Sequence, residues 1–262
     1  MPNLFIIATP IGNLEDISKR ALRILKEVDL ILCEDTRVTK KLLDRYQIKT
    51  PTLSYHEHSK LKKVDYILEL LKQDKNLALV SDAGTPGISD PGNKLVKQVI
   101  DLFGREITII PVPGPSAVTA AASIAGFSMD KFVFIGFPPT KKKRKKFFEE
   151  IINSKYPVIF YESPYRILKS LNELKNISLA LGLELQVVVC RELTKKFETI
   201  YRGKGEEDKS SSSATRALAK GEKERMFFDS SRKRDSVIEE IIKKIEKDKV
   251  RGEFVVAIKR KR

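Results

Sequence analysis

The residues best suited to binding chemistry form a rigid, bare loop, SDAGTPGISDPG (81–92), directly after the apolar run LALV. The loop has three glycines, two prolines and two aspartates among its twelve residues. Glycine allows close approaches of the backbone that a Cβ would forbid, and proline fixes φ. This composition predicts a stiff ledge of main-chain donors and acceptors, the glycine shelf, that holds a small molecule.

Other rigid or charged clusters follow apolar runs in the same way. They are PIGN (10–13), EDTR (34–37), HEH (56–58), PGPSA (113–117), ESPYR (162–166) and RELTK (191–195). Ordinary turns explain each cluster singly, but they explain the charge and the common position of the clusters poorly. Because open α/β sheets bind ligands at the carboxyl ends of their strands, we expect these clusters to gather at one edge.

The elements that would position the first clusters alternate along the chain. We expect strands at 4–9, 30–35, 52–56, 77–82 and 107–112. Between them, apolar residues at helical spacing predict helices at 17–28, 36–48, 58–73 and 92–103. Buried strands separated by amphipathic helices indicate an α/β fold with a mostly parallel N-terminal sheet covered on both faces.

A second α/β unit follows a stretch of small residues, for which we expect a helix at 115–126. We expect its strands, in a mixed sheet, at 131–137, 157–163, 185–192, 197–203 and 252–258, and helices at 147–153 and 237–247. The predicted domains are 1–117 and 118–262. The polar, serine-rich stretch 205–235 is interpreted as a mobile insertion, with an RNA-binding arm through Arg232, Lys233 and Arg234 as the alternative.

The net charge of +15, with a pI near 9.6, favours a polyanionic partner such as nucleic acid. The alternative is a lysine-rich proteome that places lysine on every surface. Cys33 and Cys190 lie in apolar runs, which is typical of core thiols in a reducing compartment. With no leader pattern at the N-terminus, these features predict a cytoplasmic protein.

Several familiar sites are excluded by their missing motifs. The sequence contains no GxxxxGK[ST] phosphate loop, no GxGxxG after the first strand and no GxSxG. His56 and His58 have no third ligand spaced near them, so we predict no metal site and interpret them as hydrogen-bonding residues near the ligand.

The sequence resembles the tetrapyrrole (corrin/porphyrin) methylase superfamily, and within it the enzymes that methylate small-subunit ribosomal RNA. Eight motifs in order support the resemblance: TPIGNLEDIS, CEDTR, SDAGTPGISDPG, VPGPSA, FIGFPP, FYESPYR, CRELTKKFE and GEFVVAI. It covers residues 4 to about 204 and resumes near 250. It implies two α/β domains with S-adenosylmethionine in a cleft between them, and a homodimer. It also implies 2′-O-methylation of a cytidine in the decoding region of 16S ribosomal RNA.

The resemblance further implies which residues hold the methyl donor, mostly through backbone contacts. They are Pro10, Asp82, Ala83, Gly84, Thr85, Ser116, Ala117, Tyr161 and the backbone around Phe254. Pro91 and Gly92 are interpreted as turn residues only.

A ribose hydroxyl is a poor nucleophile at neutral pH, so a base or a cation near it should help. The EDTR turn offers Glu34 and Asp35 as acceptors and Arg37 as a phosphate or ribose anchor. A Glu34–Arg37 ion pair that caps a helix is the equally weighted alternative. Second-rank candidates are Glu162, Arg166, Arg191 and Lys195.

The stretch TKKKRKK (140–146), which we call the basic run, contains six consecutive cations, more than a solvated face needs. We interpret Lys141, Lys142, Lys143 and Arg144 as RNA-backbone contacts, helped by Arg166, Arg191 and Lys195; a solubility face is the alternative. The phenylalanines that follow, Phe147 and Phe148, should point into the core. The tail KRKR (259–262) is weaker support for RNA binding.

Three functions therefore compete. A ribosomal RNA methyltransferase explains both the motifs and the charge. A small-molecule, precorrin-type methyltransferase of the same fold explains the glycine shelf but not the basic run. A non-catalytic RNA-binding protein explains the charge but not the donor site.

Overall fold

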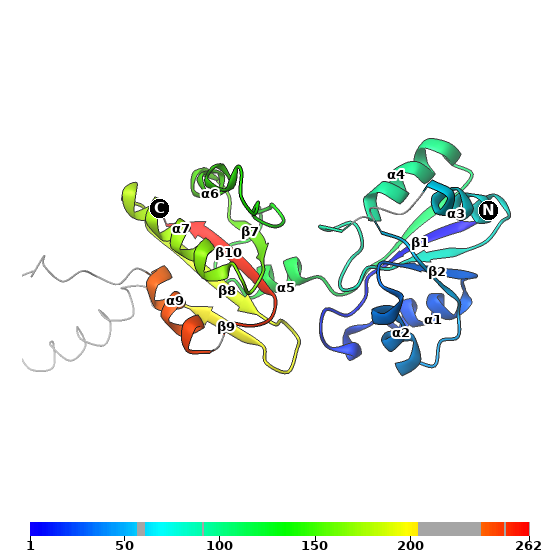
Figure 1. Cartoon of the computed structure of the whole chain (residues 1–262), viewed down its shortest axis with the longest axis horizontal. Helices are drawn as coiled ribbons and strands as arrows, with labels where there is room; N and C mark the ends of the chain where they lie inside the picture. Colours follow the sequence, from blue (N-terminus) through cyan, green and yellow to red (C-terminus); the bar gives the residue numbers. More distant parts are fainter. Residues whose placement is uncertain (57–60, 91, 204–236, 249, 262) are drawn as a thin grey trace, which may run out of the picture. The chain divides into compact units, whose positions relative to one another are not determined.

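The computed structural model describes residues 1–56, 61–90, 92–203, 237–248 and 250–261 of the chain. The chain divides into two compact units, which are described separately below (Figure 1). The first comprises Met1–Ala120 with Leu193–Lys196, and the second comprises Ala121–Glu192 with Phe197–Arg262. The stretch 205–235, interpreted above as an insertion, lies outside the described residues.

The first unit is built on a five-stranded sheet of order β3-β2-β4-β1-β5, in which every neighbouring pair is parallel. The strands are β1 (Asn3–Ile7), β2 (Leu30–Cys33), β3 (Thr52–Ser54), β4 (Leu77–Leu79) and β5 (Thr108–Val112). The prediction of a mostly parallel N-terminal sheet is confirmed. Because all five strands run the same way, the loops that follow them meet at one edge.

Helices cover both faces of this sheet (Figure 1). They are α1 (Lys19–Glu27), α2 (Thr36–Arg45), α3 (Leu61–Lys72) and α4 (Gly92–Phe103), with a short 3-10 helix, η1 (Leu14–Asp16). Successive strand residues point to opposite faces. Thus Ile31 and Cys33 of β2 pack in the core formed with α1 and α2, whereas Leu32 packs in the core formed with α3 and α4.

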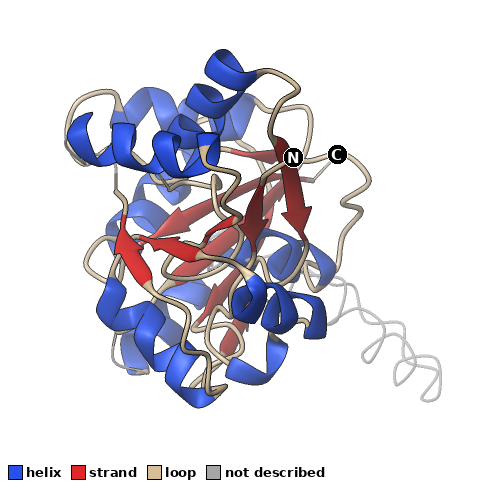
Figure 2. Ribbon diagram, turned by 90° about the vertical axis from the view of Figure 1, so that its right-hand side faces the viewer, coloured by secondary structure: helices blue, strands red, loops and turns tan. Residues whose placement is uncertain are grey.

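The second unit contains a mixed five-stranded sheet of order β6-β7-β10-β8-β9. Its strands are β6 (Val133–Phe134), β7 (Val158–Glu162), β8 (Leu185–Arg191), β9 (Thr199–Arg202) and β10 (Phe254–Arg260). The β6–β7 pair is parallel and the other pairs are antiparallel, which confirms the mixed C-terminal sheet. The strands and helices of both units are distinguished by colour in Figure 2.

Three helices share one hydrophobic core with the second sheet. They are α6 (Arg144–Asn153), α7 (Ile167–Ala180) and α9 (Val237–Lys247); a fourth helix, α5 (Ala117–Ser123), is shorter than the helix expected at 115–126. Phe148 is fully buried in this core and Phe147 packs against it, as predicted. None of the helices in the described ranges is both long and apolar enough to cross a membrane.

Helix α7 is absent from the elements expected from the sequence. Its buried face mixes Ile167, Leu171 and Leu174 with two serines, Ser170 and Ser178. These buried polar residues interrupt the apolar spacing on which the prediction depends. The serines are buried because Ser170 belongs to a polar network, described below, and the Ser178 hydroxyl donates to the Lys175 carbonyl of the preceding turn.

Candidate functional site

The glycine shelf is fixed to the segment that follows β1. The Gly84 N–H donates to the Thr9 carbonyl at 3.0 Å, and the Thr9 N–H donates to the Gly84 carbonyl at 2.9 Å. The Thr9 hydroxyl also donates to the Ser81 carbonyl at 3.2 Å. Gly84 adopts a φ of +82°, which residues with a Cβ rarely adopt. The shelf therefore depends on glycine at position 84 for its backbone path.

The two main-chain donors that flank Gly84 in the shelf have no internal acceptor. Among the residues that the structure describes, no acceptor lies within hydrogen-bonding distance of the N–H groups of Ala83 and Thr85. The Thr85 hydroxyl donates to the Pro115 carbonyl at 3.2 Å, so the shelf and the 113–117 loop are joined. Ala83 is exposed and Thr85 is half-buried. This arrangement fits a small polar ligand held by backbone groups.

The second half of the shelf forms a turn. The Asp90 carboxylate accepts the N–H of Gly87 at 2.5 Å and the N–H of Gly92 at 2.9 Å. The Asn93 side-chain amide donates to the Gly87 carbonyl at 2.7 Å. These bonds agree with a turn role for Gly92, while Pro91 lies outside the described residues.

The EDTR turn, which follows β2, begins a helix. The Asp35 carboxylate caps α2 by accepting the Arg37 N–H at 2.8 Å, and it binds the Arg37 guanidinium at 2.7 Å. The hydrogen bonds from the Arg37 side chain, followed by that from its N–H, lower the pKa of Asp35 to about 2. The capping ion pair with Arg37, considered above as an alternative for Glu34, is made by Asp35.

Glu34 points toward the glycine shelf. Its carboxylate accepts the Asp82 N–H at 3.2 Å, while the Asp82 carboxylate accepts the Asp35 N–H at 3.0 Å. Burial is the main cause that raises the pKa of Glu34, and the negative charges of Asp82 and Asp90 raise it further. The neighbouring residues 34 and 35 therefore differ in basicity, since Glu34 holds a proton more readily than an ordinary glutamate.

We expect this difference to be visible by carbon-13 NMR titration of the carboxyl groups. Asp35 should titrate near pH 2 and shift part of the way back to 3.8 in Arg37→Gln, which keeps the capping N–H. Glu34 should titrate above 4.5. Lys40→Gln, which changes an exposed cation on α2, should leave Asp35 unaffected. Titration of Asp35 near 3.8 in the parent protein would contradict the ion pair.

Because folding shifts the two pKa values in opposite directions, the stability of the fold depends on pH in opposite ways through the two carboxyl groups. Folding lowers the pKa of Asp35, so its contribution is present above about pH 4 and is lost as the pH falls through about 2. Folding raises the pKa of Glu34, so its contribution is present below about pH 4 and is lost as the pH rises through the folded-state value.

The PIGN loop packs against residues 193–195 of the RELTK segment, which belong to the first unit. The Asn13 N–H donates to the Thr194 hydroxyl at 3.1 Å. A Cβ on Gly12 would overlap the side-chain stem of Lys195. Pro10 is buried at the start of the loop. The structure therefore places Lys195 beside the PIGN loop, among the elements that surround the glycine shelf.

Three predicted segments of the second unit meet at one edge of its sheet. The register pairs Phe254 of β10 with Glu162 of β7 on one side and with Arg191 of β8 on the other. Phe254 is buried, with only 1% of its surface exposed. The half-buried Tyr161 ring lies 4.9 Å from the Phe134 ring and 5.3 Å from the Phe137 ring, measured between centroids.

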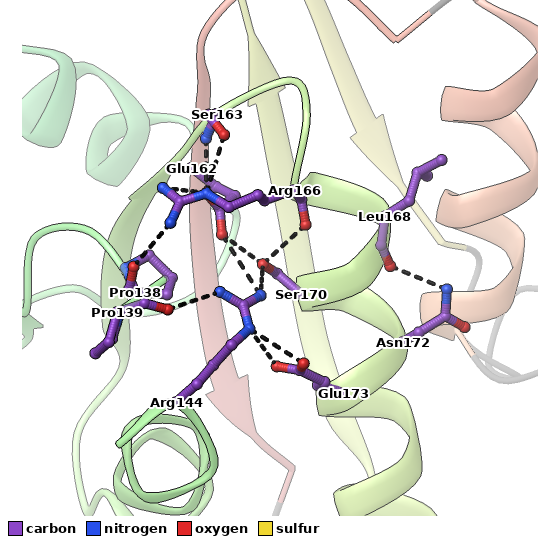
Figure 3. A network of polar contacts seen from close by, with 10 residues as sticks. All are labelled: Pro138, Pro139, Arg144, Glu162, Ser163, Arg166, Leu168, Ser170, Asn172 and Glu173. Carbon is purple, nitrogen blue, oxygen red and sulfur yellow. Dashed lines mark hydrogen bonds and ion pairs between the residues drawn. The ribbon is translucent and has the colours of Figure 1, made fainter. Parts of the chain in front are cut away.

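Glu162 is the centre of a buried polar network (Figure 3). Its side chain is inaccessible to solvent and forms ion pairs with Arg166 at 3.1 Å and Arg144 at 3.8 Å. It also accepts the Ser170 hydroxyl at 2.5 Å and the Ser163 N–H at 2.8 Å. Because these partners occupy both carboxylate oxygens, the second-rank catalytic role considered for Glu162 is withdrawn.

Arg144 belongs to the same network and not to the exposed basic run. Only 6% of its side chain is accessible, and the guanidinium binds Glu173 at 2.8 Å and Ser170 at 2.6 Å. It also donates to the Pro139 carbonyl at 3.1 Å. A buried guanidinium with these partners cannot reach a phosphate, so the interpretation of Arg144 as an RNA contact is wrong. The five lysines of the basic run are all exposed: Lys141, Lys142, Lys143, Lys145 and Lys146.

The other two arginines proposed from the sequence also make internal bonds. Arg166 donates to the Ser163 hydroxyl at 3.1 Å and to the Pro138 carbonyl at 3.2 Å. Arg191 donates to the carbonyl oxygens of Arg251 at 2.8 Å and Asp248 at 3.2 Å. Both side chains therefore support loops of the second unit, which limits the donors they can offer to RNA.

The two cysteines and the described histidine, His56, form no recognisable catalytic site. Cys33 and Cys190 are buried free thiols, and burial raises the pKa of Cys190 to about 11. His56 is exposed, and His58 lies outside the described residues. In the described ranges, no group of three or more His, Cys, Asp or Glu side chains could hold a metal ion.

Most of the chain matches a known protein family. The profile of the Tetrapyrrole (Corrin/Porphyrin) Methylases matches residues 3–208. The chain belongs to this family.

Curated relatives within the tetrapyrrole methylase family are similar over most of this chain. The protein from Thermotoga maritima named "Ribosomal RNA small subunit methyltransferase I" is 46% identical over 78% of this chain and 89% of its own. Proteins of the same name from Synechocystis sp. and Vibrio cholerae are 45% and 48% identical over 76% of this chain, and over 70% and 67% of their own.

Solved structures with the tetrapyrrole methylase fold are more distant in sequence. The cobalt precorrin-4 methyltransferase of cobalamin biosynthesis has a TM-score of 0.61 at 17% identity, covering 97% of this chain and 94% of its own. The uroporphyrin-III-C-methyltransferase from Thermus thermophilus has a TM-score of 0.57 at 12% identity, covering 98% and 94%. At these identities the likeness supports the fold alone.

Sequence reasoning missed the partners that hold the network together, Ser170 and Glu173 on α7. One feature of the sequence could have indicated that Arg144 is buried, though not its partners: Arg144 is the single arginine among the six cations of the basic run. The planar guanidinium suits buried, bidentate pairing, whereas lysine suits a solvated surface. An arginine in a lysine run that is followed by a core helix is therefore a candidate for burial.

Proposed function

We propose that the protein transfers the methyl group of S-adenosylmethionine to the 2′ hydroxyl of a cytidine in the decoding region of small-subunit ribosomal RNA. The observation that carries the proposal is the identity of 45–48% with ribosomal RNA methyltransferases over about three quarters of the chain. Identity with the solved tetrapyrrole enzymes is only 12–17%. Ribosomal RNA is therefore the expected substrate, in preference to a precorrin.

The glycine shelf is the proposed binding site for the methyl donor. The free N–H groups of Ala83 and Thr85, together with the left-handed turn at Gly84, support backbone recognition of a small polar ligand. The other proposed donor contacts of the first unit are Pro10, Asp82, Ser116 and Ala117. In the second unit, the proposed donor contacts are Tyr161 and the backbone around Phe254. A bound sulfonium donor supplies an activated methyl group, so positioning the hydroxyl provides much of the rate.

Glu34 is the proposed general base. A base needs a pKa closer to the operating pH than that of an ordinary carboxylate, and burial raises the pKa of Glu34. Asp35 is a poorer base, because its pKa is held at about 2 by Arg37 and its carboxylate caps α2. The guanidinium of Arg37 is exposed and is proposed to anchor a phosphate or ribose of the substrate.

The basic run is the proposed contact with the RNA backbone, through Lys141, Lys142 and Lys143 and without Arg144. These lysines precede α6 and are exposed, as are Lys145 and Lys146 on its first turn. Lys195, beside the PIGN loop, is a further proposed contact. Arg166 and Arg191 are proposed to contribute less to RNA binding, because their side chains donate hydrogen bonds within the protein. A homodimer remains part of the proposal because the family resemblance implies it. A cytoplasmic location remains part of it because the two cysteines are buried free thiols.

The test of this function compares two substrates. Purified 30S subunits and a precorrin should each be incubated with radiolabelled S-adenosylmethionine, and the site of any label in RNA should be mapped. We expect label on a cytidine 2′ oxygen and none on the precorrin. Transfer to the precorrin alone would identify a small-molecule enzyme. Failure to bind S-adenosylmethionine at all would favour a non-catalytic RNA-binding protein.

The basic run should affect this reaction through binding. In Lys142→Glu/Lys143→Glu, RNA affinity should fall and the dependence of log K on log salt should become shallower by at least about 1.4, at about 0.7 per lost contact. Affinity for S-adenosylmethionine should not change. The control is Lys26→Glu/Lys247→Glu, which reverses two exposed lysines in the last turns of α1 and α9. If log K depended equally on log salt in the two variants, the basic run would be a solubility face and not an RNA contact.

A further inference from the structure

A groove of about 960 Å³ opens in the second unit, at the edge of its sheet opposite Glu162, Arg191 and Phe254. It is lined by residues before β7, by Gln186 of β8 and by the carboxyl end of β10. Lys259 lies five residues along β10 from Phe254, which is roughly 17 Å at about 3.4 Å per residue. The groove is therefore a separate surface from the edge that carries the proposed donor contacts of this unit.

The charge of the groove is strongly positive. Five of its lining residues are cations and one is an aspartate: Lys131, Lys155, Lys259, Arg260, Lys261 and Asp130. Lys261 is paired with Glu184 at 3.6 Å. In the described part of the chain, none of the other four cations has a carboxylate within ion-pair distance. Four uncompensated cations in one concave surface favour a ligand with several negative charges.

An aromatic side chain lies among these cations. Tyr156 lines the groove with 39% of its surface exposed, and the Lys155 ammonium lies 5.9 Å from the centroid of its ring. The Tyr156 N–H donates to the Ser154 hydroxyl at 3.2 Å, which fixes the backbone at its position. An exposed ring beside several cations is the arrangement that binds single-stranded nucleic acid, because bases stack on the ring while the cations contact phosphates.

We propose that this basic groove binds a single-stranded segment of the RNA substrate, with Lys259 and Arg260 on phosphates and Tyr156 stacked on a base. The inference rests on the proposed function for the identity of the polyanion. It adds a second contact to that of the basic run, on a surface where the tail KRKR (259–262) begins. An acidic protein segment would use the cations but would gain little from the aromatic ring.

Direct binding to a short, fluorescein-labelled oligouridine tests the groove without any methyl transfer. In Lys259→Gln/Arg260→Gln, we expect weaker binding and a salt dependence that is shallower by about 1.4, at about 0.7 per lost phosphate contact. Tyr156→Leu should weaken binding about tenfold and leave the salt dependence unchanged, since it removes stacking and no charge. Lys26→Gln/Lys247→Gln, which removes the same charge elsewhere, should behave as the parent.

Two further measurements decide between the groove and its alternatives. Polyglutamate is the second probe: if Tyr156→Leu and the double variant weaken its binding as much as that of oligouridine, the groove binds acidic protein and the proposal is overturned. Oligouridine binding that is unchanged in both groove variants also overturns it. Melting temperatures close to that of the parent would show that the variants are folded.

With 30S subunits, the double variant should raise KM severalfold and leave kcat unchanged, because the groove lies away from the donor edge. An unchanged KM would contradict a role for the groove on the assembled substrate. Absence of methylation by the parent protein would count against the proposed function, while the oligouridine titrations would still decide the groove.

Discussion

Gly84→Val should bind S-adenosylmethionine about a hundredfold more weakly than the parent protein. Valine cannot easily adopt the φ of +82° at this position, so the shelf must move. The shift would misplace the adjacent N–H groups of Ala83 and Thr85, the proposed donors to the ligand. Two hydrogen bonds at about 1 to 1.5 kcal/mol each correspond to roughly a hundredfold in affinity. Isothermal titration calorimetry without RNA measures this effect directly.

The control for Gly84→Val is Gly104→Val, at the end of α4 in the same unit. Gly104 also has a positive φ, of +53°, and a Cβ there would meet no atom within 4 Å. The two variants share the cost of a strained backbone, but only the first lies on the glycine shelf. If Gly84→Val bound S-adenosylmethionine as tightly as the parent, or if Gly104→Val lost as much affinity, the shelf would not be part of the donor site.

Arg144→Met should destabilise the protein by about 3 to 5 kcal/mol, the usual cost of removing one partner of a buried ion pair. Methionine fills a similar volume, so the loss reports chiefly on the guanidinium that binds Glu162, Glu173 and Ser170. Urea-induced unfolding followed by circular dichroism measures the change. The salt dependence of RNA binding should be unaffected, because Arg144 is buried.

The neighbouring Lys145→Met provides the matched control. The Lys145 side chain is 85% exposed and lies 3.7 Å from the Glu149 carboxylate, an arrangement of little value to stability. We expect a change well below that of Arg144→Met. If the two variants were equally stable, the network around Glu162 would contribute little, and Arg144 would have to be reconsidered as a surface residue.

Most of the fold could be predicted because its elements repeat a simple pattern. In the first unit, short apolar strands alternate with amphipathic helices, and the parallel sheet follows from that alternation. Helix α7 escaped prediction because Ser170 and Ser178 occupy its buried face. The burial of Ser170 depends on partners outside the helix, Glu162 on β7 and Arg144 on α6, and the spacing of residues within the helix carries no information about them.

The geometry of the candidate site was predictable where it depends on the backbone and less so where it depends on side chains. Glycine at position 84 indicates an unusual backbone path from its residue type alone, and the structure has φ at +82° there. For charged residues, the type does not reveal the partner. Asp35 and not Glu34 pairs with Arg37, and Arg144 turns inward while the lysines around it stay exposed. These choices are made by tertiary packing and could not be derived from spacing.

The first unit is made of two separate stretches of the chain, and this limits where the gene can be divided. Leu193–Lys196 belongs to this unit although the preceding 72 residues, Ala121–Glu192, belong to the second. Those four residues supply the Thr194 hydroxyl that accepts the Asn13 N–H and the Lys195 stem that covers Gly12. A recombination breakpoint or a premature stop anywhere between 121 and 192 therefore does not separate two complete modules. It removes a piece of the first one, so the two units are constrained to be inherited together.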